Sequence, residues 1–175
     1  MILNLFRKTP SNEAVYAVYR AIVAQSRQPV FYAEWGVPDT VTGRFDMISL
    51  HMALVFHRLR GAGGEAAEFG QALFDLFFKD MDRSLREMGA GDLAVPKKVR
   101  KMTEIFYAVM TGVNEAIERG DEAGVEAVLR RTVLVETDGA HAGALASYLV
   151  AQHGALVAQS LEALTGGKLE MAVAA

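Results

Sequence analysis

Two carboxylates, those of Asp80 and Glu87, lie seven residues apart in a stretch without proline or glycine. In a helix this spacing places both on one face, and Arg83 stands between them, three residues after Asp80 and four before Glu87. A pair of carboxylates can act as general acid and base, and the imidazole of His51 offers a further titratable group. An internal acidic pocket built from these groups would indicate a helical enzyme or a small-molecule carrier.

The same acids have two interpretations that involve no reaction. On a helical wheel that starts at Phe69 they fall inside the apolar arc, and a buried carboxylate must be paired or protonated. Its partner would be Arg83 or a basic residue of another helix, such as Arg44 or Arg100. Alternatively, acids and bases form the rim of a protein-binding surface, because the apolar arc is wider than half of the helix.

Other signals of catalysis are absent from the sequence. It has no phosphate-binding loop, dinucleotide-binding or nucleophile-elbow motif, and without cysteine it has no thiolate nucleophile and no iron–sulfur cluster. His51 and His57 are six residues apart, so a helix would not place both on one face as zinc ligands. Haem ligation by His51 or His153 is the weaker alternative. We therefore expect no catalytic residue, no metal and no cofactor.

The composition is that of a folded, single-domain protein. The chain has 175 residues, of which 51% are hydrophobic and 22% are charged, and this balance excludes a disordered chain. Its net charge of −3 argues against a broad nucleic-acid-binding surface. The uncharged stretch 139–161 is interrupted by serine, glutamine and histidine, which favours a buried helix over a membrane span. Residues 1–8 lack the charge order of an export signal, which predicts a cytoplasmic protein.

Helix signals dominate, and the sequence predicts an all-α, single-domain bundle of about six helices. A long ordered loop, about residues 27–43, separates the first two helices, and we expect residues 1–10 and 166–175 to be flexible. Pro96 suits the first turn of one helix, and Gly89 suits the left-handed residue that ends another. The expected helices span about residues 14–25, 42–60, 65–88, 96–119, 121–133 and 140–165.

Two further segments have the composition of contact surfaces. Lys97, Lys98 and Arg100 crowd the start of the fourth expected helix, where the helix dipole disfavours cations. Either they form an ordinary solvated surface, or they have an anionic counterpart, which could be acidic lipid headgroups, an acidic protein surface or carboxylates of the preceding helix. The long loop carries Tyr32 and Trp35, whose rings either pin it to the bundle or offer rigid contact area to a partner.

Two stretches of the sequence resemble, in the right order, the two signatures of the ubiquinol–cytochrome c chaperone family. The resemblance covers about residues 11–107, and beyond them only the helical character is shared. Signatures of this length are more specific than any short motif. The first consists of Phe31-Tyr32, Gly36-Val37-Pro38-Asp39-Thr40, Gly43-Arg44-Phe45-Asp46-Met47, Leu50-His51 and Arg58-Leu59. The second consists of Leu73-Phe74-Asp75, the run from Phe78 to Gly89, Gly91-Asp92 and Val95-Pro96-Lys97-Lys98, and it continues with Met102 and Phe106-Tyr107.

The resemblance implies a non-enzymatic assembly chaperone. Mitochondrial members of the family hold newly made cytochrome b, together with a small partner protein, before it joins the bc1 complex. Because a mitochondrial presequence is missing, the chain is similar to a bacterial member that associates peripherally with the inner face of the cytoplasmic membrane and contacts acidic lipid. A stable peripheral subunit of a membrane complex is an alternative, and it differs from a chaperone in remaining bound.

The expected partner-binding residues combine the charged rims of the third and fourth expected helices with residues of the first signature. The aromatic side chains would anchor the partner, and the charged ones would add electrostatic contacts. These residues are Tyr32, Trp35, Asp39, Arg44, Asp46, His51, Asp75, Asp80, Asp82, Arg86, Glu87, Asp92, Lys97, Lys98 and Arg100.

Overall fold

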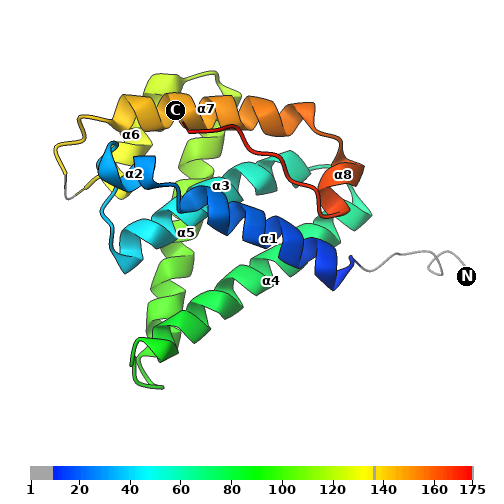
Figure 1. The fold of residues 1–175 in the computed structure, drawn as a ribbon, viewed down its shortest axis with the longest axis horizontal. Coiled ribbons are helices and arrows are strands. Elements are labelled where there is room, and N and C mark those ends of the chain that lie inside the picture. Colours follow the sequence, from blue (N-terminus) through cyan, green and yellow to red (C-terminus); the bar gives the residue numbers. More distant parts are fainter. Residues whose placement is uncertain (1–9, 136, 175) are drawn as a thin grey trace, which may run out of the picture.

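The computed structural model describes residues 10–135 and 137–174, and every regular element in this part of the chain is a helix (Figure 1). The all-α class and the single domain are thus confirmed. Residues 1–9, part of a segment expected to be flexible, lie outside the described residues. The helices are α1 (Asn12–Ser26), α2 (Pro29–Ala33), α3 (Val41–Leu59), α4 (Gly64–Glu87), α5 (Val95–Glu118), α6 (Glu122–Thr132), α7 (Ala142–Ala158) and α8 (Leu161–Thr165).

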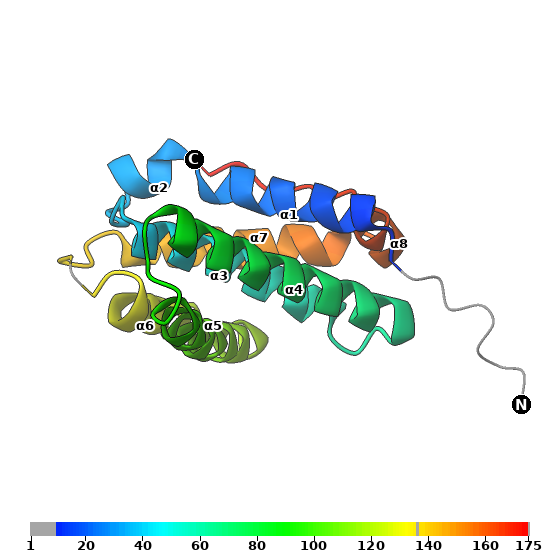
Figure 2. The same ribbon diagram turned by 90° about the horizontal axis from the view of Figure 1, so that it is seen from below.

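Helix α3 lies at the centre of the molecule and is buried over most of its length. It packs against α1, α4, α5 and α7, and Figure 2 shows α1 on one side of the molecule and α5 and α6 on the other. Its residues Met47, Leu50 and Leu54 are completely inaccessible to solvent. A helix that is apolar on all sides is stable only inside a core, so the surrounding helices supply the polar surface.

Helices α4 and α5 form a hairpin whose tip, residues 88–94, projects from the body of the molecule (Figure 1). As predicted, Gly89 follows the end of α4, and its φ of +84° lets the backbone turn away from the helix. Pro96 lies in the first turn of α5, where a backbone N–H is not needed. The two helices hold together through aromatic side chains, with the ring centroids of Phe77 and Phe106 at 5.7 Å.

The expected loop 27–43 contains a short helix, α2, which we did not predict. After it, the chain packs closely against the start of α3. The side chain of Thr40 caps α3 by accepting a 3.1 Å hydrogen bond from the amide of Gly43. A Cβ atom on Gly43 would lie 2.0 Å from the carbonyl oxygen of Pro38. The close approach of the Pro38 carbonyl therefore requires glycine at position 43, and Gly43 is part of the first signature.

The expected helix 140–165 is divided into two. The backbone becomes extended at Gln159, and the hydroxyl of Ser160 caps the separate helix α8 by accepting a hydrogen bond from the amide of Ala163. Serine at a break between two apolar segments is a typical start signal, so the boundary was present in the sequence but was read as the interior of one helix.

The C-terminal segment also differs from the flexible tail that we expected. Residues 168–174 run back past α1 and α7 (Figure 1), and their side chains at Leu169 and Met171 pack on the core. The carbonyl oxygen of Ala172 accepts a 2.7 Å hydrogen bond from Gln25, and its amide donates one of 3.0 Å to Gln152. The segment thereby joins the first helix to the seventh.

We predict that Gly43→Ala destabilises the fold by about 1–3 kcal/mol, because the new methyl group overlaps the Pro38 carbonyl. The matched control is Gly91→Ala in the hairpin tip, where a Cβ atom would meet nothing within 4 Å. Urea unfolding at neutral pH measures both. A change in the free energy of unfolding that is equal for the two variants would contradict the prediction.

Candidate partner-binding surface

An open groove of about 530 Å³ lies where the hairpin tip meets the start of α3, and we call it the tip groove. Two of its apolar side chains are exposed, Val41 at 51% and Met88 at 52%, and Leu93 in the adjoining turn is 91% exposed. Apolar exposure at a projecting tip is typical of a protein-binding site. The lining residues are Val41, Thr42, Phe45, Leu85, Met88, Gly89, Ala90, Lys98, Lys101, Met102 and Ile105.

Acidic residues of α4 and of the turn after it are held by neighbouring side chains. The Nε atom of Arg86 donates to Asp82 at 2.7 Å, and its Nη1 atom donates to Asp92 beyond the turn. Hydrogen bonding to Asp82, and more weakly to Asp92, raises the pKa of Arg86. Farther along the helix, Asp75 accepts a 2.8 Å hydrogen bond from Gln71. Exposed pairs such as these add little stability, but Arg86 links both sides of the turn and thereby restrains the tip.

Asp80, Arg83 and Glu87 form the predicted ladder of ion pairs. Arg83 donates to Asp80 and lies 3.8 Å from Glu87. The hydroxyl of Tyr19 on α1 also donates to Asp80 at 2.9 Å, and burial together with this carboxylate raises the pKa of Tyr19. The expected burial of Glu87 was wrong, because its side chain is 70% exposed where α4 projects beyond the body of the molecule.

The cations at the start of α5 have no anionic counterpart on α4. Lys97 and Lys98 are exposed and make no ion pair with another described residue. Arg100 pairs with Glu104 of its own helix at 3.1 Å. Of the three counterparts considered for this cluster, carboxylates of the preceding helix are therefore not observed. Lys98 and Lys101 instead line the tip groove and give one of its walls a positive charge.

Three of the expected partner-binding residues lie inside the protein. Trp35 is 9% exposed, and its ring packs edge-on against Phe31 and Tyr148. Asp46 is 5% exposed without a hydrogen bond to any described residue, and His51 is completely buried. The aromatic loop is thus pinned to the bundle, which is the first of its two interpretations. These side chains shape the protein and do not reach a partner in this structure.

The other residues of the loop signature lie at or near the surface. Tyr32 is half-buried, and its hydroxyl donates a 2.7 Å hydrogen bond to the carbonyl oxygen of Ser26. Asp39 and Arg44 are exposed and pair at 2.7 Å. The hydrogen bond from Arg44 lowers the pKa of Asp39. One interpretation of the sequence paired Arg44 with the carboxylate of Asp80. In the structure Arg44 pairs with Asp39 instead.

His51 lies at the centre of a buried network that joins three helices. Its Nδ1 atom lies 2.7 Å from the carbonyl oxygen of Met47, which can only accept, so Nδ1 carries the proton. Its Nε2 atom accepts from the hydroxyl of Tyr148 at 2.7 Å, and Gln25 and Gln152 donate to that hydroxyl. Burial lowers the pKa of His51 to about 4, so the ring is neutral. Both nitrogens are engaged, which leaves neither for a haem iron.

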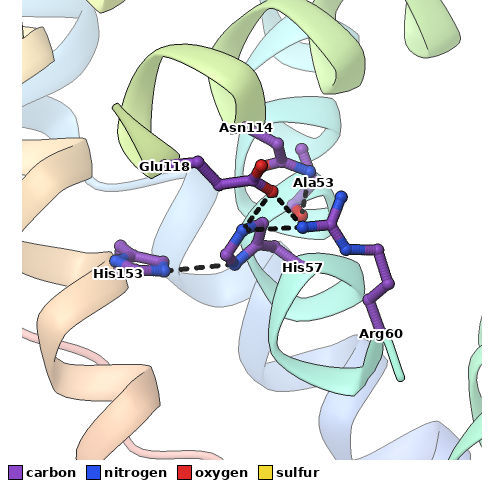
Figure 3. Close-up of polar contacts among 6 residues, drawn as sticks. All are labelled: Ala53, His57, Arg60, Asn114, Glu118 and His153. Atoms are coloured by element: carbon purple, nitrogen blue, oxygen red, sulfur yellow. Dashed lines mark hydrogen bonds and ion pairs between the residues drawn. The ribbon is translucent and has the colours of Figure 1, made fainter. Parts of the chain in front are cut away.

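A second groove, of about 560 Å³, lies between the end of α3, the first half of α4 and α5. Asn114 lines it, and its Nδ2 atom donates to the carbonyl oxygen of Ala53 at 3.3 Å while its Oδ1 atom has no partner. Figure 3 shows His57, Glu118 and His153 beside it, from three helices, with His57 lying 3.0 Å from Glu118 and 3.1 Å from His153. Sequence spacing gave no signal for this cluster, because its members are far apart in the chain.

The groups required for an internal acidic pocket do not come together. His51 lies in the core against α1 and α7, Asp80 faces Tyr19, and Glu87 faces solvent. Within residues 10–135 and 137–174, no group of three or more histidine, cysteine, aspartate or glutamate side chains is arranged to hold a metal ion. The salt-bridged acids beside open grooves are the arrangement expected of a binding surface.

Comparison with known proteins gives a consistent result. A family model described as ubiquinol-cytochrome C chaperone matches residues 33–171, and so extends well beyond the part that carried the resemblance. The ubiquinol-cytochrome-c reductase complex assembly factor 1 of Xenopus laevis is 24% identical over 125 residues, which are 71% of this chain and 62% of that protein. The mouse protein of that name is 26% identical over 119 residues, 68% of this chain and 40% of that protein. The chain therefore spans less than two thirds of the length of these relatives.

Among solved structures, the crystal structure of the Cbp3 homolog from Brucella abortus is similar to this one over almost the whole chain. The two have a TM-score of 0.87 and 37% sequence identity, and the match covers 99% of this chain and 98% of the other. Helices α6 to α8, for which the sequence signatures gave only helical character, are thus included in the shared fold.

Burial raises the pKa of Asp46 to about 7 from its ordinary 3.8, which predicts an unusual pH dependence. The folded chain keeps a proton that the unfolded chain releases above pH 3.8, so this stabilisation is complete below pH 3.8 and is lost as the pH rises to about 7. Relative to wild type, Asp46→Asn should therefore gain about 1.4 kcal/mol in the free energy of unfolding per pH unit across this window.

Urea unfolding of both proteins at about pH 4.5, 5.5 and 6.5 measures this difference. The contribution of His51 to stability changes with pH in the opposite direction. Because its pKa is lowered, this contribution is complete above pH 6.5 and is lost as the pH falls to about 4. That contribution is common to both proteins and cancels in the comparison. Parallel stability profiles for wild type and Asp46→Asn would show that the carboxyl group of Asp46 ionises normally.

Proposed function

Because this chain belongs to the ubiquinol-cytochrome C chaperone family, we propose that it binds newly made cytochrome b and assists assembly of the ubiquinol–cytochrome c reductase, or bc1, complex. The match of the family model over residues 33–171 is the observation that carries this proposal. The names of the frog and mouse relatives, which are assembly factors of this complex, support it. The activity is binding and not catalysis, in agreement with the dispersed positions of the titratable groups.

The tip groove is the proposed site for the client. Newly made cytochrome b exposes apolar segments before its partner subunits cover them, and such segments bind to apolar side chains that stand free of the fold. Met88 and Leu93 offer this contact on a hairpin that projects from the body of the molecule.

The proposed location is the inner face of the bacterial cytoplasmic membrane, where the chain would be held peripherally. No helix in the described part of the chain is sufficiently long and apolar to cross a bilayer. For a small partner protein, as implied by the family resemblance, the proposed site is the second groove, which is open between α3, α4 and α5.

Deletion of the gene should reduce both cytochrome b and assembled bc1 complex in membranes, since unprotected apolar subunits are degraded or aggregate. Haem staining, immunoblotting and native gel electrophoresis measure these quantities. Normal levels would overturn the proposal.

The tagged protein should also copurify with cytochrome b that lacks partner subunits. Its persistent presence in the finished complex would indicate a stable subunit instead.

The double variant Met88→Asp and Leu93→Asp should reduce recovery of cytochrome b with the tagged protein by roughly tenfold, because two apolar anchors become charged. Both side chains are exposed, so the fold should remain intact. The matched control is Val150→Asp with Val157→Asp, which changes two exposed valines of α7. Equal recovery with wild type and the tip variant, or equal loss with the control, would exclude the tip groove as the client site.

A further inference from the structure

A third groove, of about 470 Å³, lies between α1 and α4, and its lining is strongly basic. Tyr16 and Arg20 of α1 and Arg27, the residue directly after this helix, follow one another along one face at intervals of four and seven residues. Lys79 and Arg83 form the opposite wall, one turn apart on α4. From the rise of a helix, the α1 wall is roughly 16 Å long. We call this feature the basic groove.

Most of the positive charge in the basic groove is not neutralised. Arg20, Arg27 and Lys79 are exposed and make no ion pair with any other residue that the structure describes. Arg83 is paired with Asp80, which is the single acidic residue among the lining. Four cations therefore face one carboxylate, in a protein whose net charge is −3. Like charges gathered against the overall sign of a protein indicate an anionic ligand.

The basic groove is also lined by tyrosine and apolar side chains. Tyr19 forms part of its wall, where the charges of Asp80, Arg27 and Arg83 all act on its hydroxyl group. Tyr16 is 49% exposed at the groove, and Val23 adds a partly buried apolar surface. Tyrosine combined with arginine over a small apolar area is typical of surfaces that lie at the level of lipid headgroups.

Beyond Arg27 the basic groove continues into a neighbouring hollow. Arg27 also lines this hollow, together with Tyr32 of α2 and Arg44 of α3. Tyr32 is half-buried there and Arg44 is bound to Asp39. The shared residue makes one elongated face that contains cations and tyrosines over α1, α2 and α4.

We propose that the basic groove binds the phosphate headgroups of acidic phospholipids and holds this protein on the bilayer surface. Arg20, Arg27 and Lys79 would contact the phosphates, and Tyr16 would lie among the headgroups. The surface potential of a membrane that contains acidic lipid attracts each such cation by about 1 kcal/mol, so that a few of them give reversible peripheral binding. The tip groove and the basic groove then serve separate ligands.

The charges and apolar surface of the basic groove favour acidic lipid over nucleic acid, over an acidic peptide and over the client. Binding to nucleic acid rests on many phosphate contacts, and the groove offers only three unpaired cations on a protein whose net charge is −3. If the proposed function is right, the cytoplasmic loops of the client are themselves basic and are repelled here. An acidic peptide would pair with the cations, but it would not account for the exposed ring of Tyr16 and the apolar surface of Val23 in the groove.

The test is flotation of the purified full chain, without any client, with vesicles of phosphatidylcholine containing about 0 or 30% phosphatidylglycerol. The groove variant carries Arg20→Gln, Arg27→Gln and Lys79→Gln. The control carries Arg119→Gln, Arg131→Gln and Lys168→Gln, which removes the same charge from exposed positions that line none of the grooves described above. We expect wild type to bind only the acidic vesicles, the groove variant to bind at least roughly tenfold more weakly, and the control to change by less than about twofold.

Several outcomes would overturn the proposal. These are failure of wild type to bind acidic vesicles, equal loss in the two variants, or displacement from vesicles by polyglutamate at concentrations where glycerol phosphate has no effect. The last result would assign the groove to an acidic protein. Binding of glycerol phosphate by wild type, without binding to acidic vesicles, would indicate a soluble phosphate ligand. Because cytochrome b is absent, failure here leaves the proposed function standing, and unchanged thermal melting confirms that the variants fold.

Discussion

The burial of α3 on all sides is the constraint on which the rest of the structure depends. Met47, Leu50 and Leu54 are inaccessible, so α1, α4, α5 and α7 must all pack around one helix. The neutral imidazole of His51 lies within this packing, where it accepts from Tyr148, and the same network reaches the C-terminal segment through Gln25. Because the core is organised around α3, the α4–α5 hairpin is anchored at its base and its tip is left free.

Much of the fold was predictable from the sequence, because its strongest signals are local. Gly89 and Pro96 marked the ends of the hairpin helices, and both act as expected. The errors arose where a short local preference competed with tertiary contacts. The five residues of α2 are too few for periodicity to reveal, and the C-terminal segment is ordered by hydrogen bonds to Gln25 and Gln152 that no local pattern encodes.

The candidate site was less predictable, since a signature records which residues a family shares and not where each one lies. Asp46 and His51 belong to the first signature and Trp35 lies within its span, yet all three are buried, so their role is to build the loop and the core. Leu93 was overlooked, although an exposed leucine in a glycine-rich turn was a visible signal of contact. The basic groove was not predicted either, because its two walls are more than fifty residues apart in the chain.

The central claim is that the free tip of the α4–α5 hairpin touches the client. A photoreactive amino acid placed at Leu93, with the same group at Val157 as reference, tests this in living cells, since both positions are exposed. Crosslinking followed by mass spectrometry should yield an adduct with cytochrome b from position 93 and none from position 157. An adduct with cytochrome b from position 157 alone would contradict the claim and move the client to another face.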